Sequence, residues 1–425
     1  MGTLSDRSLV EIRRDLHAHP EVGWTEYRTT ALVAEALADL GFTLHLGEAA
    51  LDPADRMGVP PDGTLASARA RAEDEGAPAD YVDRLDETTG LVATRTFGDA
   101  GTTVGLRVDM DALEREEDAD PDHPPYRDGY HSRHPNEMHA CGHDGHVAIG
   151  IGVARALTAT STFDGTLKLF VQPAEEGCRG GLAMSRSGHL DDVDHLLAVH
   201  LGLGYGTGTV VAGFDRPYAN AKLDVTFEGE AAHAGVAPDA GRNALQAAAT
   251  AITNLYSLPR DADGLTRVNV GQVHAPNAQN VIAEEASLRL EVRGEGERIN
   301  ERLLDRARTT VAAAASMHDV GHREALYGKA TTFEADAPMI DAVATTAEAV
   351  DEVTRVVRRA RIPASEDAAY LVRRVQERGG TATYVGIGSE IPAGHHESRF
   401  DIDEDALAIG VDVLVGAIRQ LSAAG

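Results

Sequence analysis

The chain has 425 residues, of which 43% are hydrophobic, and its formal net charge at neutral pH is −29. This length and composition predict a globular protein of about two domains, and the acidic surface excludes nucleic-acid binding, because phosphate contacts need clustered basic residues. We recognise neither a secretory leader nor a run of about 18 apolar residues, and therefore expect a cytoplasmic protein without a membrane span.

The basic residues are unevenly divided, since Lys168, Lys222 and Lys329 are the only lysines among 39 lysines and arginines. Strong acidity with so few lysines favours a halophilic protein, in which dense counterions screen the repulsion between carboxylates. The alternative is an acidic enzyme without such adaptation, and the scarcity of lysine argues against it.

The first hundred residues are predicted to form two helices and an insert. Apolar residues recur at helical spacing over 4–40, which predicts two helices around a turn at 19–20, and Gly41 is expected to end the second one. The acidic, alanine-rich stretch from about 50 to 97 is interpreted as an insert with one helix, over 78–85, and no chemistry of its own.

Buried strands are predicted at 103–108, 165–171 and 196–199, with a helix over 146–157 after the first of them. Carboxylates at the end of a strand face a ligand crevice in open α/β sheets. All three strands end at residues able to carry chemistry, and we expect these to meet at one sheet edge: Asp109 and Asp111, Glu175 and Glu176, and His200.

The order of elements changes after residue 213. A strand at 222–227, a helix at 243–258, strands near 267–273 and 286–293 and a helix at 299–317 fit a β-α-β-β-α-β order. This order predicts a small sheet covered on one face by two helices and inserted into the main domain, which resumes near 337. We place the inserted domain at 216–330 and the catalytic domain at 1–215 and 331–425.

Residues 138–146, Met-His-Ala-Cys-Gly-His-Asp-Gly-His, concentrate a thiol, imidazoles and a carboxylate in a chain with two cysteines. A thiolate and a neutral imidazole are good ligands for zinc, manganese or cobalt, and the glycines allow Cys141 and His143 to face one ion. A structural zinc ribbon would need more cysteines. The alternative, a buried cysteine beside surface histidines, is disfavoured by the acidic residues downstream.

The complete ligand inventory fits two divalent ions: Cys141, His143, Glu176, His200 and one of His395 or His396. Paired ions polarise an amide carbonyl and acidify a water between them. Because the side chains of consecutive residues diverge, we assign Glu176 as a ligand and Glu175 as the general base. Asp111 is expected to orient a ligand imidazole. Manganese, zinc, cobalt and nickel all suit such ligands.

The motifs resemble a family of dinuclear metallohydrolases that includes aminoacylases, hippurate hydrolases, auxin-conjugate amidohydrolases and glutamate-releasing carboxypeptidases. The resemblance spans nearly the whole chain, is closest to the branch that acts on p-aminobenzoyl-glutamate, and rests on segments such as "RVDMDAL", "MHACGHDGH", "QPAEEG", "AAHAG" and "AGHHESRFDIDEDAL". It implies an α/β fold, with a phosphorylase/hydrolase-like mixed-sheet catalytic domain and a ferredoxin-like α+β lid that also dimerises.

The resemblance also implies roles for individual residues. His233 would reach the active site of a neighbouring protomer and polarise the scissile carbonyl as an oxyanion donor, although the chain alone leaves a structural role open. Asn280 would help to hold the substrate carboxylate, with Arg293 a weaker candidate; Ala283 stands where the family usually has proline. The spacing to the downstream "RFD" favours His396 as the last ligand.

The sequence thus predicts a metal-dependent amidohydrolase that cleaves an N-acyl or N-aroyl amino acid through metal-activated water. Two alternatives stay open: a broader aminoacylase or dipeptidase with the same site, and a non-catalytic subunit of a hetero-oligomeric hydrolase. Retention of Glu175 argues against the second, because a binding module needs no general base. The chain is expected to pair through its lid with a copy of itself or with a related subunit.

Overall fold

The chain divides into two compact units, and its computed structural model describes residues 3–99, 101–160, 163–362 and 364–423. The large unit comprises Met1–Asp215, Phe333–Ile362 and Asp367–Gly425, and the inserted unit comprises Arg216–Thr332 and Pro363–Glu366. Each unit has its own hydrophobic core.

The N-terminal segment confirms the two predicted helices, α1 (Leu9–Ala18) and α2 (Tyr27–Asp39). Helix α1 begins with a capping box, in which Ser8 and Glu11 satisfy each other's backbone N–H groups. Helix α2 ends before Gly41, whose φ of 79° lies in the left-handed region that glycine adopts without steric cost.

The insert differs from its prediction in two ways. It contains a second helix, α3 (Asp62–Asp74), before the predicted one, which is the short α4 (Ala79–Val82). Its last residues form strand β2 (Leu91–Phe97), which belongs to the main sheet and pairs with β1 (Thr43–Leu46). The hydrophobic pattern of α3 is too weak for its helical period to stand out, because alanines and arginines alternate along it.

A mixed nine-stranded sheet forms the centre of the large unit, in the order β1-β2-β4-β3-β5-β13-β6-β11, with β12 also pairing with β6. The predicted strands β3 (Thr103–Asp109), β4 (Gly165–Gln172) and β5 (His195–Leu201) are neighbours and run parallel. The remaining strands are β6 (Thr209–Asp215), β11 (Arg355–Val357), β12 (Ala360–Arg361) and β13 (Thr381–Ile387).

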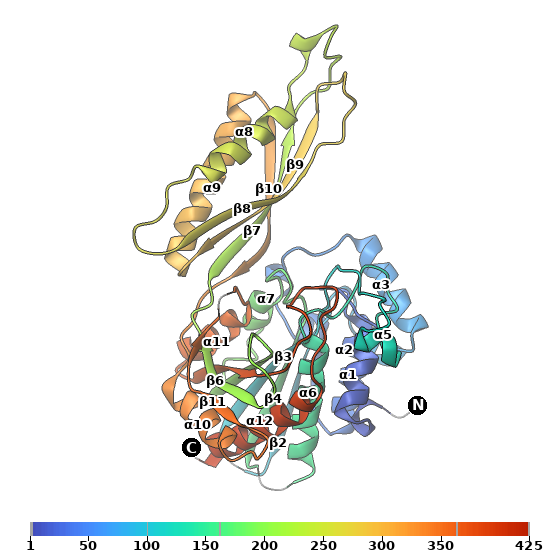
Figure 1. Ribbon diagram of the computed structural model, residues 1–425, viewed down its shortest axis with the longest axis vertical. Coiled ribbons are helices and arrows are strands. Elements are labelled where there is room, and N and C mark those ends of the chain that lie inside the picture. The colour runs from blue at the N-terminus through green and yellow to red at the C-terminus, as the bar shows by residue number, and fades with distance from the viewer. Residues whose placement is uncertain (1–2, 100, 161–162, 363, 424–425) are drawn as a thin grey trace. The chain divides into compact units, whose positions relative to one another are not determined.

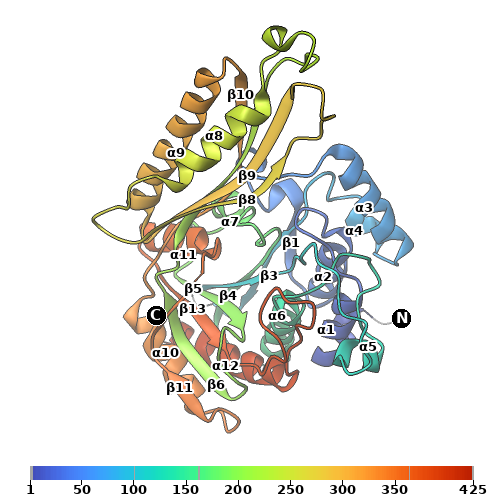
Figure 2. The same cartoon turned by 45° about the horizontal axis from the view of Figure 1, so that its top comes forward.

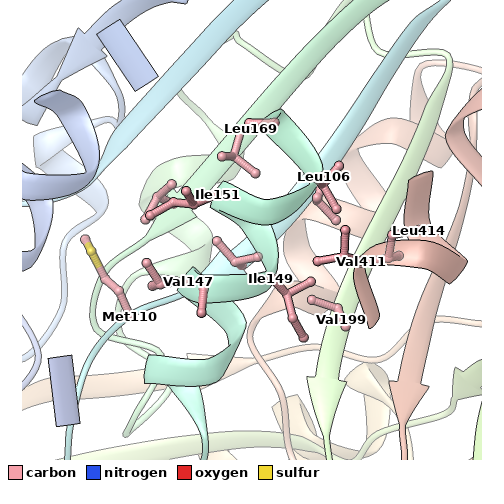
Figure 3. Packing of buried hydrophobic residues seen from close by; sticks show 14 of the residues in the cluster. Leu106, Met110, Val147, Ile149, Ile151, Leu169, Val199, Val411 and Leu414 are labelled. Carbon is pink, nitrogen blue, oxygen red and sulfur yellow. The ribbon is translucent and has the colours of Figure 1, made fainter. Parts of the chain in front are cut away.

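Side chains alternate between the two faces of this sheet, as strand geometry requires. On β5, Leu197 and Val199 join one buried cluster while Leu196 and Ala198 join the other. Figure 3 shows the first cluster around Ile149 of helix α6. Helices pack on both faces (Figure 2): α6 (His143–Thr158), α10 (Ala337–Ala347) and α12 (Asp405–Ala423) with the first cluster, and α7 (Gly181–Ser185) and α11 (Ala368–Glu377) with the second.

Among the described residues, helix α12 is the one helix that is long and apolar enough to cross a membrane by length and composition. It has 19 residues with a mean hydropathy of 1.5, and 61% of that window is buried inside the protein. Its apolar side chains pack into the core, since Leu407, Leu414 and Ile418 are fully or almost fully buried. A core helix of this length meets the same criteria as a membrane span.

The inserted unit has the predicted β-α-β-β-α-β order. Its four antiparallel strands lie in the order β10-β7-β9-β8, which is the ferredoxin-like arrangement, and both helices cover one face (Figure 1). Its elements are β7 (Ala219–Glu228), α8 (Ala244–Tyr256), β8 (Thr266–His274), β9 (Glu285–Gly294), α9 (Glu297–Met317) and β10 (Gly321–Ala330).

Short helices complete the described part of the chain. They are α5 (Pro124–Asp128) and the single 3₁₀ turns η1 (Leu4–Asp6), η2 (Gly47–Ala49), η3 (Pro53–Asp55) and η4 (Pro238–Ala240).

Candidate active site

The carboxyl ends of β3, β4 and β5 bring the predicted site residues of the large unit together. Asp109, the last residue of β3, is paired in register with Gln172, the last residue of β4, and β5 ends at Leu201 beside His200. Because the three strands run parallel and adjacent, the loops that follow them share one edge of the sheet.

The start of helix α6 adds the thiol and an imidazole to this edge. The helix begins at His143, three residues before the predicted start, because Gly142 has a φ of 88° and turns the chain into it. Gly145 allows a close approach, since a Cβ there would lie 2.5 Å from a methyl of Leu201. This packing sets Cys141 and His143 against the end of β5.

The predicted ligands form two groups, in each of which all potential ligand atoms lie within 4.8 Å of one another. The first contains Cys141, His143 and His200, with 3.6 Å between the Cys141 Sγ and the His200 Nε2. The second contains Cys141, Glu176 and His396, with 3.3 Å between the His396 Nε2 and a Glu176 carboxylate oxygen. Cys141 belongs to both groups.

The two neighbouring histidines of the C-terminal loop face different partners. The backbone N–H of His396 donates to the carbonyl of Ala140 at 2.8 Å, and its φ of 65° turns the side chain toward Cys141 and Glu176. The Nε2 of His395 instead donates to the carbonyl of Leu201 at 3.3 Å. The arrangement supports His396, the residue favoured by the sequence, as the ligand.

His143 provides a test of whether the site fits a metal ion. Its Nδ1 donates to the backbone carbonyl of Asp111 at 2.9 Å, while its Nε2 is buried and has no hydrogen-bond partner among the described residues. A buried polar atom without a partner is costly. A cation bound by this nitrogen would remove that cost, and thiolate, imidazole and carboxylate groups form a ligand set that divalent transition metals accept.

The electrostatics of the site also favour a cation. Burial lowers the pKa of His143, but Asp109 and Cys141 outweigh it and raise that pKa well above its ordinary value. Hydrogen bonds to Cys141 and Glu176 raise the pKa of His396 to about 10. The groups that stabilise a proton on these rings would equally stabilise a divalent ion in its place. Burial and then His146 lower the pKa of His200, which keeps this ring neutral, as a ligand requires.

The two glutamates do not diverge as we predicted for consecutive residues. Residues 175–178 form a turn, in which the N–H of Cys178 donates to the carbonyl of Glu175 at 2.6 Å, and Ala174 enters the turn with a φ of 52°. In this turn both carboxylates lie within 4.8 Å of a ring nitrogen of His143. The divergence rule applies to extended strands, and β4 has already ended at Gln172.

The carboxylate of Asp111 holds this turn in place. Its two oxygens accept the backbone N–H groups of Glu175 at 3.0 Å and of Glu176 at 2.8 Å, and the first oxygen also lies 3.2 Å from the His143 Nδ1. The contact with an imidazole agrees with the role expected for Asp111. Nothing in the sequence indicated the contacts with the glutamate backbone.

Glu26, at the start of helix α2, is a participant that sequence reasoning missed. It is completely buried, and its carboxylate accepts the N–H of Ala174 at 2.8 Å and the hydroxyl of Thr89 at 2.6 Å. Burial, followed by the nearby Asp111 carboxylate, raises the pKa of Glu26 to about 8. The contact spans 148 residues of sequence, and a signal for it could come only from the three-dimensional fold.

In the inserted unit, two of the three predicted residues are neighbours. His233 forms an isolated bridge with Val281, and the N–H of Ala234 donates to the carbonyl of Asn280 at 2.9 Å. Both His233 and Asn280 are exposed.

Arg293 lies near the far end of β9, and its guanidinium donates to the carboxylate of Glu291. At the usual rise per residue, Arg293 is about 25 Å from Glu285, the first residue of the strand, which follows the loop of Asn280. The structure therefore does not bring Arg293 together with His233 and Asn280. The register of β9 decides this, because residue 293 pairs with residues at the opposite end of the sheet.

Comparison with known proteins identifies the family. The model of "Peptidase family M20/M25/M40" matches residues 105–420. The chain belongs to this peptidase family.

Two relatives are each 44% identical to the chain. One is an indole-3-acetyl-aspartic acid hydrolase from Enterobacter agglomerans, with 96% of this chain and 94% of the relative covered. The other is one subunit of the p-aminobenzoyl-glutamate hydrolase of Escherichia coli (strain K12), with 95% and 93% covered. A crystal structure of an aminobenzoyl-glutamate utilization protein from Klebsiella pneumoniae is 39% identical, with a TM-score of 0.84 and 97% and 95% coverage. Family membership and these relatives make the chain a metal-dependent amidohydrolase.

Proposed function

We propose that the chain hydrolyses the amide bond of an N-acyl or N-aroyl amino acid, with p-aminobenzoyl-glutamate as the first candidate substrate and p-aminobenzoate and glutamate as products. The named substrates of the two relatives at 44% identity both join an aromatic acid to an acidic amino acid. The observation that carries the proposal is the convergence of a thiol, imidazoles and two glutamates at one sheet edge.

Two divalent ions, manganese or zinc with cobalt and nickel also suitable, would be held by five residues: Cys141, His143, Glu176, His200 and His396. When bound, such ions polarise an amide carbonyl and lower the pKa of water. Cys141 would serve both ions because it belongs to both groups of ligand atoms. Asp111 would fix the ring of His143 through the Nδ1, so that the Nε2 faces the ion.

Glu175 would act as the general base. Its carboxylate lies beside the ligand groups, and Asp111 holds its backbone N–H. It would take a proton from the attacking water and deliver this proton to the nitrogen of the leaving amine, so that the acid and the amino acid both leave as stable products.

His233 and Asn280 would bind the substrate from the inserted unit, which would act as a lid and as the dimerisation domain. The N–H groups of Gly235 and Val236 both donate to the His233 Nδ1, at 3.2 Å each, so the proton of the neutral ring of this exposed residue resides on the Nε2. That N–H is available to donate to a developing oxyanion. Asn280 would hold the substrate carboxylate, and the position of Arg293 argues against its sharing this role.

We further propose that the enzyme works in the cytoplasm and at high salt, as a homodimer or with a related subunit. The chain has two cysteines, and a reducing compartment would keep the thiol of Cys141 available for metal. The E. coli relative is named as one subunit of its hydrolase, which supports a hetero-oligomeric option.

The decisive experiment is hydrolysis of p-aminobenzoyl-glutamate by the purified protein in molar potassium chloride with manganese or zinc, with indole-3-acetyl-aspartate, hippurate and acetyl-amino acids in parallel. We expect glutamate release, and Glu175→Gln should lower kcat by about 10²- to 10⁴-fold while the metal content is kept. Cleavage of only the simple acyl substrates would favour a broad aminoacylase or dipeptidase. Absence of all cleavage would contradict the proposal and favour a non-catalytic subunit.

A further inference from the structure

The backbone of Leu201, at the end of β5, forms hydrogen bonds with three histidine side chains. Its N–H donates to the His146 Nε2 at 2.9 Å, and its carbonyl accepts from the His200 Nδ1 at 2.7 Å and from the His395 Nε2 at 3.3 Å. One residue's backbone therefore fixes the ring of His200, a proposed metal ligand, through the nitrogen that faces away from Cys141.

The N–H of Leu201 donates to His146 because no neighbouring strand offers it a carbonyl at this position. Strand β3 pairs with β5 only as far as Ala198, while β13 accompanies β5 on its other side to Leu201. The N–H of the next residue, Gly202, donates to Ile387 of β13, so the N–H of Leu201 points to the side that β3 has left. The imidazole of His146 takes the place of the absent strand.

The ring of His146 is in turn held by a hydrogen bond to Asp109. Its Nδ1 donates to a carboxylate oxygen of Asp109 at 2.5 Å, and the other oxygen of Asp109 accepts from Arg107 at 2.6 Å. All three side chains are completely buried. Since the Nε2 accepts an N–H, the proton resides on the Nδ1, and the ring orientation and tautomer are both determined.

Asp109, His143 and His146 could also be interpreted as a third group of metal ligands, because their potential ligand atoms lie within 4.8 Å of one another. The hydrogen bonds argue against this interpretation. Both nitrogens of His146 and both oxygens of Asp109 already have hydrogen-bond partners, whereas the Nε2 of His143 has no hydrogen-bond partner among the described residues and lies 3.8 Å from the nearer Asp109 oxygen.

We infer that His146 is a positioning residue, which holds the Leu201 backbone so that the His200 Nε2 faces the metal site. The chain of contacts runs from Arg107 through Asp109 and His146 to the Leu201 N–H, and from the Leu201 carbonyl to His200. This inference rests on the proposed function only in taking His200 as a metal ligand.

Two variants separate the link to Leu201 from the link to Asp109. The longer amide of His146→Gln reaches the position of the Nε2, and its oxygen can accept the Leu201 N–H. The shorter amide of His146→Asn reaches only the position of the Nδ1, and its NH₂ can donate to Asp109. The readouts are cobalt affinity, by competition with a chelator, the absorption spectrum of the cobalt-loaded protein, and thermal unfolding of the metal-free protein.

We expect His146→Asn to bind cobalt about 10- to 100-fold more weakly, with altered cobalt bands, and His146→Gln to stay close to the parent protein. Parent-like binding by both folded variants, equal loss in both, or loss confined to His146→Gln would each overturn the inference. If the parent protein showed no thiolate-to-cobalt absorption, the proposed metal site itself would fail, which is a separate result.

A measurement on the unsubstituted protein covers the case in which the variants do not fold. Nuclear magnetic resonance of protein labelled with isotopic nitrogen in histidine and leucine should show a coupling between the Leu201 amide and the His146 Nε2, with the ring proton on the Nδ1. A His146 ring protonated on the Nε2 would overturn the inference.

Discussion

The carboxylate of Asp111 accepts the backbone N–H of Glu176 at 2.8 Å, and the same group accepts the N–H of Glu175 and contacts the ring of His143. One buried side chain thus connects a proposed ligand that follows β4, the proposed base and a proposed ligand from α6. The relative position of base and metal ligands depends on it.

Asp111→Asn should therefore impair metal binding as well as stability. An asparagine offers one acceptor oxygen, so a buried N–H of the glutamate turn loses its partner at a cost of about 1–3 kcal/mol. Metal affinity should fall about 10- to 100-fold. Chemical unfolding and chelator competition measure the two effects.

Asp401→Asn is a matched control, because Asp401 is equally a buried carboxylate but binds Arg13 and Tyr130. It should lose stability and keep its metal affinity. An Asp111→Asn protein with the same behaviour as this control would contradict the role given to Asp111.

Glu26 should make the stability of the metal-free protein depend on pH. Its pKa is about 8 in the folded chain against 4.5 for an unperturbed glutamate, so between these values the folded state holds a proton that the unfolded state has released. The contribution of Glu26 to the free energy of unfolding is fully present below pH 4.5 and is lost as the pH rises through about 8. Relative to the parent, Glu26→Gln should gain stability over this window, by up to about 5 kcal/mol.

Unfolding of the two proteins in urea at several pH values measures this difference. Thr89→Val removes a hydrogen bond to the same carboxylate but keeps the titrating group, so its pH dependence should persist. A constant difference between parent and Glu26→Gln from acid to alkaline pH would contradict the assignment.

His233→Ala should lower kcat by about 10²- to 10³-fold without loss of folding, because an exposed donor to the oxyanion is removed. Arg293→Ala, at the far end of β9, should have little effect on kcat. If His233 acts across a dimer, a mixture of His233→Ala and Glu175→Gln chains should regain about a quarter of the parent activity, since half of the dimers then contain one intact site.

One outcome of the mixing experiment would contradict a role of His233 in the partner's site. No recovery of activity, in a mixture shown to exchange protomers, would mean that His233 does not act in the partner's site.

High salt should stabilise the protein. With a net charge of −29, self-repulsion is large at roughly 0.1 M potassium chloride, where the Debye length is about 10 Å, and is strongly screened in molar salt. We expect Tm to rise by several degrees between these conditions, and glucose at equal osmolality to have a smaller effect. A Tm that is independent of potassium chloride would contradict the halophilic prediction.

Hydrophobic runs that end in acids or histidines were sufficient to predict the sheet edge of the site. The β-branched run before Asp109 and the apolar run before Glu175 are buried strands, and their parallel order brings their ends together. The β-α-β-β-α-β pattern likewise predicted the ferredoxin-like unit, since each element has a clear hydrophobic period.

What the sequence did not reveal depends on contacts between distant segments or on backbone conformation. The pair of Glu26 and Ala174 and the pair of Asp109 and His146 form only after folding. The turn that brings both glutamates together follows from the left-handed backbone of Ala174, which no local residue preference indicates, because alanine rarely adopts it.

Besides the direct contact of their rings, whose centroids lie 4.7 Å apart, His146 and His200 are connected through the main chain of Leu201, and every residue except proline offers the same N–H and carbonyl. The hydrogen bonds of this connection therefore do not depend on the side chain of residue 201, which packs in the hydrophobic core. Correlated substitutions between positions 146 and 200 are not needed to preserve it, so an inspection of aligned sequences would overlook a coupling that a backbone-level experiment can detect.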